Sequence, residues 1–557
     1  MTLSRRSLTR SICTSGRAGA GAGGRATLQR MPRATLAVAL VAGLVALGAC
    51  SLAGLDGYSS GYPGADGGGD TSVSDVRVDG PIVIDAPACE GGYICAGQCV
   101  DVAKNPSHCG ACGKTCAAGY GCANGVCGNV PVGIGGGAID TCAVLAGGEV
   151  WCWGRDVWGE VGVDPSKANA ACPFMADKCQ TVPAKVVGVT DAVSVAMGSE
   201  AACALQATGA VTCWGSNLSD QLGHDPATDA TCTKAGGPNS GQQGPCSYVP
   251  KPVALPGGVV AKKLAFSSYT GCILSTAGDV YCWGTNRDGE IKSPVGGKEW
   301  QPTKRASGAT DVSVSSSAEN FSTICVVGAG GVTSCWGQAS DDPTLGPGYS
   351  FFPTSGAVGC QFDRCDPTAH VIPTNFQSQT GQVLADSVAV GYFAACALQG
   401  SVALCWGHDG YGQRGNGTTA AALFDPVAPV GVPALSAVSN LGLTTALLDA
   451  TGQVWMFGWN ATGQIGDGTY GGTPCAGPGG GNCVTSPKKI PALTNVSRVS
   501  SALTGAVALT VDHKVLTWGA NYTGELGHAP GGVGDGFCPG AATYYCNPTP
   551  TVVQGLP

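Results

Sequence analysis

The stretch that decides the fold is Cys142-Ala-Val-Leu-Ala-Gly-Gly-Glu-Val-Trp-Cys152-Trp153-Gly154, because the chain goes on to repeat it. Six further copies follow, and each ends in an aromatic residue before a glycine. Seven such units, spaced 51 to 70 residues apart, are typical of a ring of β-sheets that forms one domain. The repeated aromatic residues are Trp153, Trp214, Trp283, Trp336, Trp406, Phe457 and Trp518.

Each copy predicts a β-hairpin whose turn follows from the spacing of its cysteines. In the first four copies nine residues separate two cysteines, so cysteines that face each other on antiparallel strands leave a three-residue loop. The third residue of such a loop needs a positive φ. The seventh copy has His513 there, and the shortened fifth copy has Gly400-Ser401, which suits a two-residue turn. The other copies have Gly148, Gly209, Gly278, Gly331 and Gly452.

The hairpin cysteines are present or absent as pairs. Copy six has Ala446 with Met456, and copy seven has Val507 with Thr517. Joint loss favours cross-strand disulfides over zinc ligands, and we expect neither a metal nor another cofactor. The predicted pairs are Cys142 with Cys152, Cys203 with Cys213, Cys272 with Cys282, Cys325 with Cys335, and Cys396 with Cys405.

A second set of ten cysteines lies between the turn-rich stretch after each Trp-Gly and the next proline-rich strand. These cysteines occur in close pairs, and the two shortest repeat intervals, of 53 and 51 residues, lack them. We predict that each pair is a disulfide that ties a loop insertion, and that all the insertions lie on one rim of the ring. The pairs are Cys172 with Cys179, Cys232 with Cys246, Cys360 with Cys365, Cys475 with Cys483, and Cys538 with Cys546.

The tied insertions are unevenly distributed, since copies six, seven, one and two form an unbroken arc around a closed ring. We predict that this arc binds a partner, because loops that are already tied lose less entropy on docking. Simple bracing of the fold is the alternative. The side chains expected on this rim are Phe174, Met175, Tyr248, Phe537, Tyr544 and Tyr545, mostly of types favoured at interface centres.

The turn-rich stretches complete a repeat that can be compared with known families. Residues 459–466, Trp-Asn-Ala-Thr-Gly-Gln-Ile-Gly, and 520–527, Ala-Asn-Tyr-Thr-Gly-Glu-Leu-Gly, show them most clearly. With the hairpins, they resemble the regulator of chromosome condensation repeat over residues 129–557. The resemblance implies an all-β fold, a seven-bladed β-propeller closed by its termini. Family members that bind a small GTPase or cover the active site of a β-lactamase suggest binding and not catalysis.

The two ends of the repeat region predict how the ring closes. Residues 550–555 match 183–188, and residues 130–141 match the segment before Cys203. We therefore expect one blade to be shared between the termini, which would remove the free edges of the ring. The turns at 288–292 and 340–346 depart from the pattern, so we expect the third and fourth blades to be less regular.

A separate module precedes the repeats, with eight cysteines in residues 89–128. So small a segment needs disulfides in an exported protein, and eight cysteines allow 105 pairings, which leaves the connectivity open. The run Cys99-Val100-Asp101 to Cys112-Gly113 resembles the cysteine-rich repeats of stigma-specific proteins, which implies no chemistry. The remaining cysteines of the module are Cys89, Cys95, Cys109, Cys116, Cys122 and Cys127.

The N-terminal region predicts an exported protein. Residues 34–49 form an apolar run preceded by arginines, too short to span a bilayer comfortably, so we interpret 1–49 as a signal peptide, with Met31 as an alternative start. Leu47-Gly48-Ala49-Cys50 resembles the bacterial lipobox, which implies lipidation of Cys50 and an outer-membrane lipoprotein at the cell surface or facing the periplasm. Residues 50–88 are rich in Gly, Ser and Asp, which favours a flexible tether.

Charge narrows the choice of partner. The chain has a net charge of −8, but residues 1–49 carry seven arginines and no acid, which leaves 22 basic and 37 acidic residues after cleavage. Such a surface repels phosphate backbones, so we expect no nucleic acid partner and no membrane contact beyond the lipid. The expected function is binding of a protein or glycan by a monomeric envelope protein. A structural envelope module without a specific ligand is the alternative.

Overall fold

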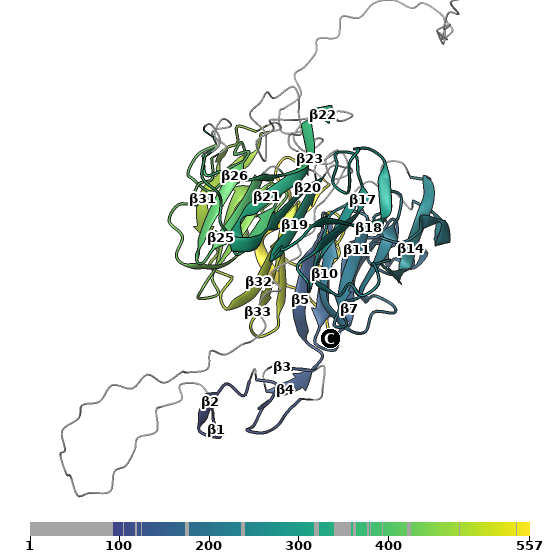
Figure 1. Ribbon diagram of the computed structural model, residues 1–557. Helices are drawn as coiled ribbons and strands as arrows, with labels where there is room; N and C mark the ends of the chain where they lie inside the picture. Colours follow the sequence, from purple (N-terminus) through teal and green to yellow (C-terminus); the bar gives the residue numbers. More distant parts are fainter. Residues whose placement is uncertain are drawn as a thin grey trace, which may run out of the picture.

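The computed structural model describes residues 93–557 except 104, 117–119, 124, 173–177, 235–239, 317–321, 339–357, 360–363, 376–377, 379, 393, 420–424, 478–479 and 542. The signal peptide, Cys50 and the tether lie outside the described residues. Most of the described chain forms a ring of seven antiparallel sheets, the blades, which confirms the predicted seven-bladed β-propeller (Figure 1). In the part described, no helix is long and apolar enough to cross a membrane.

The first three blades follow one another along the chain. Blade 1 contains β5 (Pro131–Gly136), β6 (Asp140–Leu145), β7 (Val150–Arg155), β9 (Lys178–Lys185) and β8 (Ala170–Ala171), with η1 (Pro165–Lys167) before β8. Blade 2 contains β10 (Ala192–Met197), β11 (Ala201–Gln206), β12 (Val211–Ser216), β14 (Gln243–Pro252) and β13 (Ala230–Thr233), with η2 (Pro226–Thr228) before β13. Blade 3 contains β15 (Ala261–Phe266), β16 (Thr270–Ser275), β17 (Val280–Thr285) and β18 (Lys298–Ala306).

The next four blades vary more in strand number. Blade 4 contains β19 (Asp311–Ser316), β20 (Ser322–Val327), β21 (Thr333–Gln338), β23 (Arg364–Val371) and β22 (Val358–Gly359), with η3 (Ala329–Gly331) in its hairpin. Blade 5 contains β24 (Ser387–Val390), β25 (Ala394–Gln399) and β26 (Val402–Gly407). Blade 6 contains β27 (Leu435–Leu441), β28 (Thr444–Asp449), β29 (Val454–Trp459), β31 (Asn482–Lys489) and β30 (Thr473–Pro474). Blade 7 contains β32 (Val496–Ser501), β33 (Gly505–Thr510), β34 (Val515–Ala520), β36 (Tyr545–Val552) and β35 (Gly536–Phe537).

Every blade is built from one continuous segment, so the expectation of a blade shared between the termini is wrong. The sequence matches that led to this expectation do identify equivalent strands. Residues 131–136 form the innermost strand of blade 1, and residues 545–552 form the fourth strand of blade 7. When each repeat is counted from its innermost strand, however, seven complete blades result. The ring closes because blades 7 and 1 meet directly: Trp153 Nε1 and Thr141 Oγ1 both donate to Glu525 O, at 3.0 and 3.1 Å.

The hairpins adopt the predicted turns. The five predicted glycines have φ between +79° and +83°, and His513 has φ +64°. Gln399 pairs with Val402 across the two-residue turn of blade 5. These conformations place the second and third strands of each blade in one register, in which the residue before the glycine of each Trp-Gly or Phe-Gly pair is buried.

A repeated turn connects neighbouring blades, and we call it the junction turn. It begins with Asn or Asp, whose side-chain oxygen accepts from the backbone five residues later, as in Ile291 N to Asn286 Oδ1 at 2.9 Å. Its fifth residue is Glu or Gln, whose side chain accepts from the backbone two residues earlier, as in Asp288 N to Glu290 Oε2 at 2.8 Å. The carbonyl of that residue accepts from the next blade, as in Trp336 Nε1 to Glu290 O at 3.0 Å. The described junction turns are 156–162, 217–223, 286–292, 409–415, 460–466 and 521–527.

Blade 3 is therefore regular, contrary to expectation, because 286–292 makes the same hydrogen bonds as the other junction turns. Blade 5 is the incomplete one. Its fourth-strand position holds a single bridge between Cys405 and Val427, and prolines at 426 and 429 flank that bridge. Residues 340–346 of blade 4 lie outside the described residues.

The cysteine-rich module contains two small hairpins, β1 (Tyr93–Cys95) with β2 (Gln98–Val100) and β3 (Gly121–Ala123) with β4 (Val126–Gly128). Its described disulfides are Cys95–Cys112, Cys109–Cys122 and Cys116–Cys127. Cys99 is also disulfide-bonded. The module lies next to the hairpin of blade 1, since a Cβ added at Gly121 would lie 3.8 Å from Ala146 Cβ, and the chain that leaves the module is held there because Gly147 N donates to Asn129 Oδ1 at 2.7 Å.

Candidate binding face

The ring has two faces that differ in what they carry. The turns between second and third strands form the hairpin face, where the cysteine-rich module is attached. The junction turns and all insertions between third and fourth strands form the opposite face, the insertion face. Figure 1 shows the module strands β3 and β4 at one end of the propeller and β22, which belongs to an insertion, at the other.

The hairpin disulfides lie inside the blades. The pairs Cys142–Cys152, Cys203–Cys213, Cys272–Cys282, Cys325–Cys335 and Cys396–Cys405 are bonded, with Cα atoms 4.0 to 4.1 Å apart. All ten residues are fully buried. In blades 6 and 7 Ala446 lies opposite Met456 and Val507 opposite Thr517, so the register is kept without a disulfide.

The insertion disulfides tie a short edge strand to the fourth strand of the same blade. The described bonds are Cys172–Cys179, Cys232–Cys246, Cys475–Cys483 and Cys538–Cys546. Cys365 is also disulfide-bonded, and its predicted partner Cys360 lies outside the described residues. Blades 3 and 5, which lack the second cysteine pair, also have no fifth strand among the residues described. So many disulfides indicate an extracellular or otherwise oxidising compartment.

The blades that carry four of the insertions, blades 6, 7, 1 and 2, pack directly against one another. Each junction turn packs against the fourth strand of the following blade: Gly463 lies against Pro548, Gly524 against Thr181, and Gly159 against Tyr248. A Cβ added at these glycines would come within 2.4 to 2.7 Å of its neighbour, so the contacts are close. The same contact occurs outside the predicted arc, as between Gly289 and Pro367, so it is a feature of the ring as a whole, and the arc as a binding surface stays a prediction.

The predicted rim residues have different environments. Phe537 is 57% exposed and stacks on Tyr545, with ring centroids 5.0 Å apart, while Tyr248 is 39% exposed. Tyr544 is half-buried, with its ring centroid 5.4 Å from that of Tyr522 in the junction turn, and it packs against a buried cluster that also includes Ile139 of blade 1. Phe174 and Met175 lie outside the described residues.

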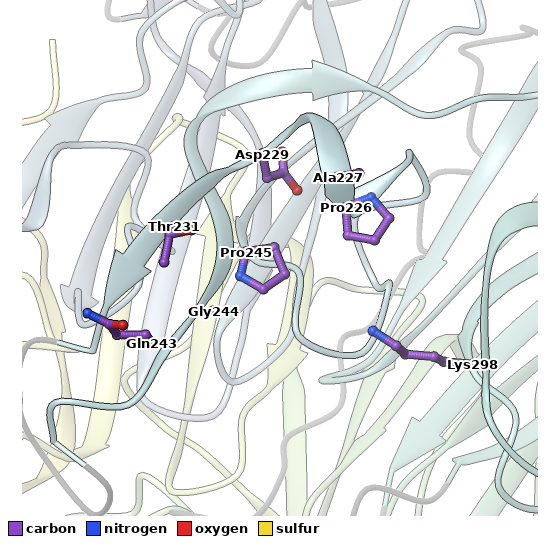
Figure 2. Close-up of a pocket in the computed structure, with 8 residues that line it drawn as sticks. All are labelled: Pro226, Ala227, Asp229, Thr231, Gln243, Gly244, Pro245 and Lys298. Carbon is purple, nitrogen blue, oxygen red and sulfur yellow. The ribbon is translucent and has the colours of Figure 1, made fainter.

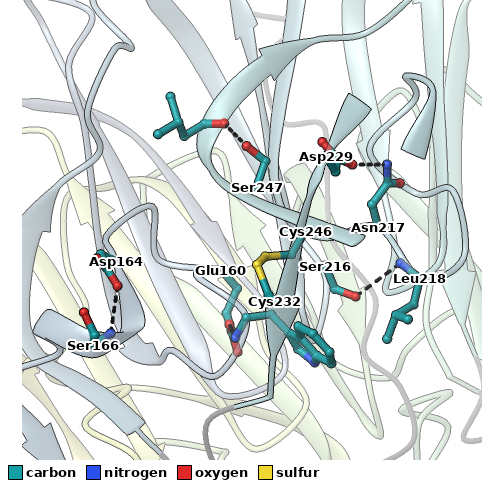
Figure 3. Close-up of a disulfide and its surroundings, with 12 residues drawn as sticks. Glu160, Asp164, Ser166, Ser216, Asn217, Leu218, Asp229, Cys232, Cys246 and Ser247 are labelled. Atoms are coloured by element: carbon teal, nitrogen blue, oxygen red, sulfur yellow. Dashed lines mark hydrogen bonds between the residues drawn. A yellow bond between two sulfur atoms is a disulfide. The ribbon is translucent and has the colours of Figure 1, made fainter. Parts of the chain in front are cut away.

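His224 and His528 occupy the same position in their repeats, and each pairs with an aspartate of the insertion that follows it. His224 Nε2 lies 2.8 Å from Asp229 Oδ1, and Asn217 Nδ2 donates to Asp229 Oδ2 at 2.6 Å, beside the Cys232–Cys246 disulfide (Figure 3). Burial alone would raise the pKa of Asp229, but hydrogen bonds from His224, Lys251 and Asn217 outweigh it and lower that pKa.

Blade 7 repeats this arrangement. His528 Nε2 lies 3.0 Å from Asp535 Oδ1, and Asn521 Nδ2 donates to Asp535 Oδ2 at 2.7 Å. The first residue of the junction turn therefore fixes the insertion in both blades. Both histidines thus hydrogen-bond within the turn structure of their own blade.

Sequence reasoning missed a cavity of about 430 Å³ between blades 2 and 3. Its walls come from η2, β13 and β14, and Lys298 closes it from the first residue of β18 (Figure 2). Lys298 Nζ is 2.7 Å from Asp220 Oδ1 and donates to Leu218 O at 3.1 Å, which links blade 3 to the junction turn of blade 2. The cavity is lined by Pro226, Ala227, Asp229, Thr231, Gln243, Gly244, Pro245 and Lys298.

Comparison with known families finds two matches along the chain. Residues 192–221 and 261–290 match the regulator of chromosome condensation (RCC1) repeat. Both segments run from the innermost strand of a blade to the Glu or Gln of its junction turn. Residues 87–130 match the stigma-specific STIG1-like protein family, in agreement with the predicted cysteine-rich module.

Relatives and solved structures cover the propeller. The chain is 24% identical to human E3 ubiquitin-protein ligase HERC2 over 408 residues, which are 72% of this chain but only 7% of HERC2. It is 24% identical to the ultraviolet-B receptor UVR8 of Arabidopsis thaliana over 402 residues, 71% of this chain and 78% of UVR8.

Yeast RCC1 (Prp20) bound to Kap60 superposes with a TM-score of 0.50 at 16% identity, over 73% of this chain and 84% of that structure. Human WBSCR16 also superposes with a TM-score of 0.50 at 17% identity, over 73% of this chain and 95% of that structure. The chain therefore carries RCC1 repeats in a seven-bladed β-propeller, preceded by a cysteine-rich module that matches the stigma-specific STIG1-like family.

Proposed function

We propose that this protein is an envelope lipoprotein, anchored through Cys50, whose propeller binds a partner with the insertions of blades 6, 7, 1 and 2. The observation that carries the proposal is the uneven distribution of tied insertions, four of which belong to consecutive blades of the ring and extend from the same face. The hairpins of the opposite face keep two- and three-residue turns.

A protein is the favoured partner. Solved relatives of similar fold are described with protein partners, such as Kap60 for yeast RCC1. Phe537, stacked on Tyr545 and more than half exposed, is the kind of rigid aromatic anchor that stands at the centre of many protein interfaces. The disulfide next to it, Cys538–Cys546, reduces the ordering entropy that docking would otherwise cost. A glycan could stack on the same ring and is the second candidate.

Site-specific photo-crosslinking in the full chain tests the proposal. A photoreactive phenylalanine analogue replaces Phe537 on the insertion face or, as a matched control, Val402 on the hairpin face, which is 54% exposed. We expect a discrete adduct from position 537 and none from position 402. Protease digestion then separates a protein adduct from a glycan adduct. Equal labelling from both positions, or none from 537, would contradict the proposal and support a purely structural role.

A further inference from the structure

The seam between blades 7 and 1 buries two carboxyl groups. Asp140, the first residue of β6, is 1% exposed, and Glu525, in the junction turn of blade 7, is 6% exposed. Neither oxygen of Asp140 and only one oxygen of Glu525 has a hydrogen-bond partner among the described residues. Burial of an ionised carboxylate without partners is strongly unfavourable. The geometry of the seam therefore suits neutral groups.

The charges around this pair do not neutralise it. Asp140 is faced by Glu160, Arg155, Glu525 and Asp156, three acids and one base. Arg155 Nη1 also lies 3.8 Å from Glu200 Oε1. The same Glu200 oxygen forms an ion pair with Lys234 Nζ at 3.0 Å. Burial, followed by the charge of Glu160, raises the pKa of Asp140 well above its ordinary value. Burial raises the pKa of Glu525 to about 7, against the hydrogen bonds that its turn donates.

The repeats supply an internal comparison, because glutamine replaces glutamate at this position in blades 2, 5 and 6. Thr523 N donates to Glu525 Oε2 at 2.6 Å, and Thr462 N donates to Gln464 Oε1 at 2.8 Å. The carbonyls of both residues then accept from the next blade, Glu525 from Trp153 and Gln464 from Trp518. A neutral amide thus performs the same structural task, and the fold at this position does not depend on a charge.

We propose that the seam is a pH-sensitive closure of the ring, in which Asp140 and Glu525 are neutral when blades 7 and 1 are in contact and ionise when the contact loosens. The junction between blades 6 and 7 has Gln464 at the equivalent place and is insensitive to pH. The two backbone acceptors that hold the seam, Glu525 O and Ile139 O, belong to the same two segments as the carboxyl groups, since Thr523 Oγ1 donates to Ile139 O at 3.0 Å. Ionisation therefore acts directly on the closing contacts.

The sign of the effect follows from proton linkage. Both carboxyl groups bind protons more tightly in the closed ring than in an opened one, so closure is strongest below about pH 4.5. It weakens as pH rises through about 7, where Glu525 loses its proton in the closed ring. Between about pH 4.5 and pH 7 the opening of the seam is coupled to the release of about one proton from Glu525, which corresponds to roughly a tenfold increase in opening per pH unit, and above pH 7 this group adds no further pH dependence.

Hydrogen exchange on the full chain, measured by mass spectrometry from pH 5.5 to 9 and corrected for the intrinsic exchange rate, tests this proposal. Peptides covering 137–141 and 520–527 report the seam, and peptides covering 460–466 report the control junction. We expect protection of the seam to fall roughly tenfold per pH unit from pH 5.5 to about pH 7 and to fall less steeply above pH 7, while protection of the control junction stays constant.

Two reciprocal variants make the result specific. Glu525→Gln should flatten the pH dependence of the seam, and Gln464→Glu should introduce such a dependence at the junction of blades 6 and 7. Because Gln is native at this position in three blades, Glu525→Gln is expected to fold, and Asp140→Asn provides a second variant if Gln464→Glu does not. Identical pH curves for the seam in wild type and Glu525→Gln would overturn the proposal, as would equal pH dependence at both junctions of the wild type.

Discussion

The hairpin face and the insertion face of this propeller use disulfides differently. On the hairpin side, disulfides are part of the sheet: their Cα atoms lie 4.0 to 4.1 Å apart and two blades replace them with apolar or small side chains in the same register. On the insertion face, they tie a short added edge strand to the fourth strand, and the corresponding Cα distances are 5.1 to 5.8 Å. The comparison teaches that the hairpin disulfides belong to the repeated part of the blade, whereas the insertion disulfides accompany a fifth strand that blades 3 and 5 lack among the residues described.

The junction turn separates the part of each repeat that keeps its length from the part that carries an insertion. Up to the Glu or Gln of the junction turn, each repeat must form its first three strands and pack against the tryptophan or phenylalanine of the next blade. Beyond it, the chain is constrained only to return to the fourth strand. Length therefore varies on the insertion face, which is where we place partner binding.

The largest expected effect on stability comes from breaking the contact between a junction turn and the tryptophan of the next blade. Trp283 is fully buried, and its Nε1 donates to Gln221 O at 2.8 Å. Trp283→Ala should lower the free energy of unfolding by about 3 to 5 kcal/mol, because it leaves a large cavity and an unpaired carbonyl. Denaturant unfolding followed by fluorescence measures the loss. Trp300→Ala, at a half-buried position, is the control, and an equal loss in both variants would contradict the role of the junction.

Removal of a hairpin disulfide should have a smaller effect. Cys272→Ala with Cys282→Met copies the Ala446 and Met456 pair of blade 6 into blade 3. The apolar packing is kept while a loop of ten residues is opened, so we expect a loss of about 2 to 3 kcal/mol with the fold retained. Circular dichroism and the denaturation midpoint measure both parts. Loss of the β-sheet spectrum would show that the disulfide defines the register, contrary to the comparison.

A pH-dependent effect is expected at the junction turn of blade 3. Burial, with the charge of Asp288 beside it, raises the pKa of Glu290 to about 8. The stabilisation that this group contributes is complete below about pH 4.5 and is lost as pH rises through 8. Glu290→Gln should therefore match wild type at pH 5 and exceed it by about 1 to 2 kcal/mol at pH 9. A stability difference that does not change with pH would show that Glu290 is not neutral in the folded protein.

The smallest effect on stability should come from shortening an insertion. Replacement of residues 528–544 by residues 293–296 of blade 3, together with Cys546→Ser, gives blade 7 the short connection of its neighbour. The native short segment offers Pro294 O and Gly296 O to Asn286, which suits Asn521 equally well. Loop-closure entropy then changes the unfolding free energy by only about 1 kcal/mol. A loss as large as that of Trp283→Ala would mean that the insertion is part of the core.

Much of the fold could be predicted from local signals. The positive φ of Gly148 and His513 follows from cysteine spacing and turn chemistry, since both act within a few residues. That each blade is one continuous segment could not be deduced from the same repeats. The matched segments at the two ends of the chain are compatible with blades that start at any of the repeated strands. The recurring Glu or Gln at positions such as 290 and 464 was a visible signal that we did not interpret, since its partner lies in the next blade.

The candidate site was less accessible to sequence reasoning. Tyr544 is of a residue type favoured at interfaces, but it packs on Tyr522 of the neighbouring junction turn. The cavity next to Lys298 depends on a side chain that the next blade supplies, so no local pattern indicates it. Position in the repeat predicted which face carries the insertions, whereas exposure of individual side chains depended on contacts across blades.

The central claim, that the insertion face binds the partner, is tested most directly by a full chain in which the insertions of blades 6, 7, 1 and 2 are all replaced by the short connection of blade 3. Binding of the molecule identified by crosslinking at position 537 is measured by surface plasmon resonance for this chain and for the native one. We predict that the exchanged chain keeps its β-sheet circular dichroism spectrum and loses binding by at least a hundredfold, equivalent to about 2.7 kcal/mol. Unchanged binding by the folded, exchanged chain would contradict the account.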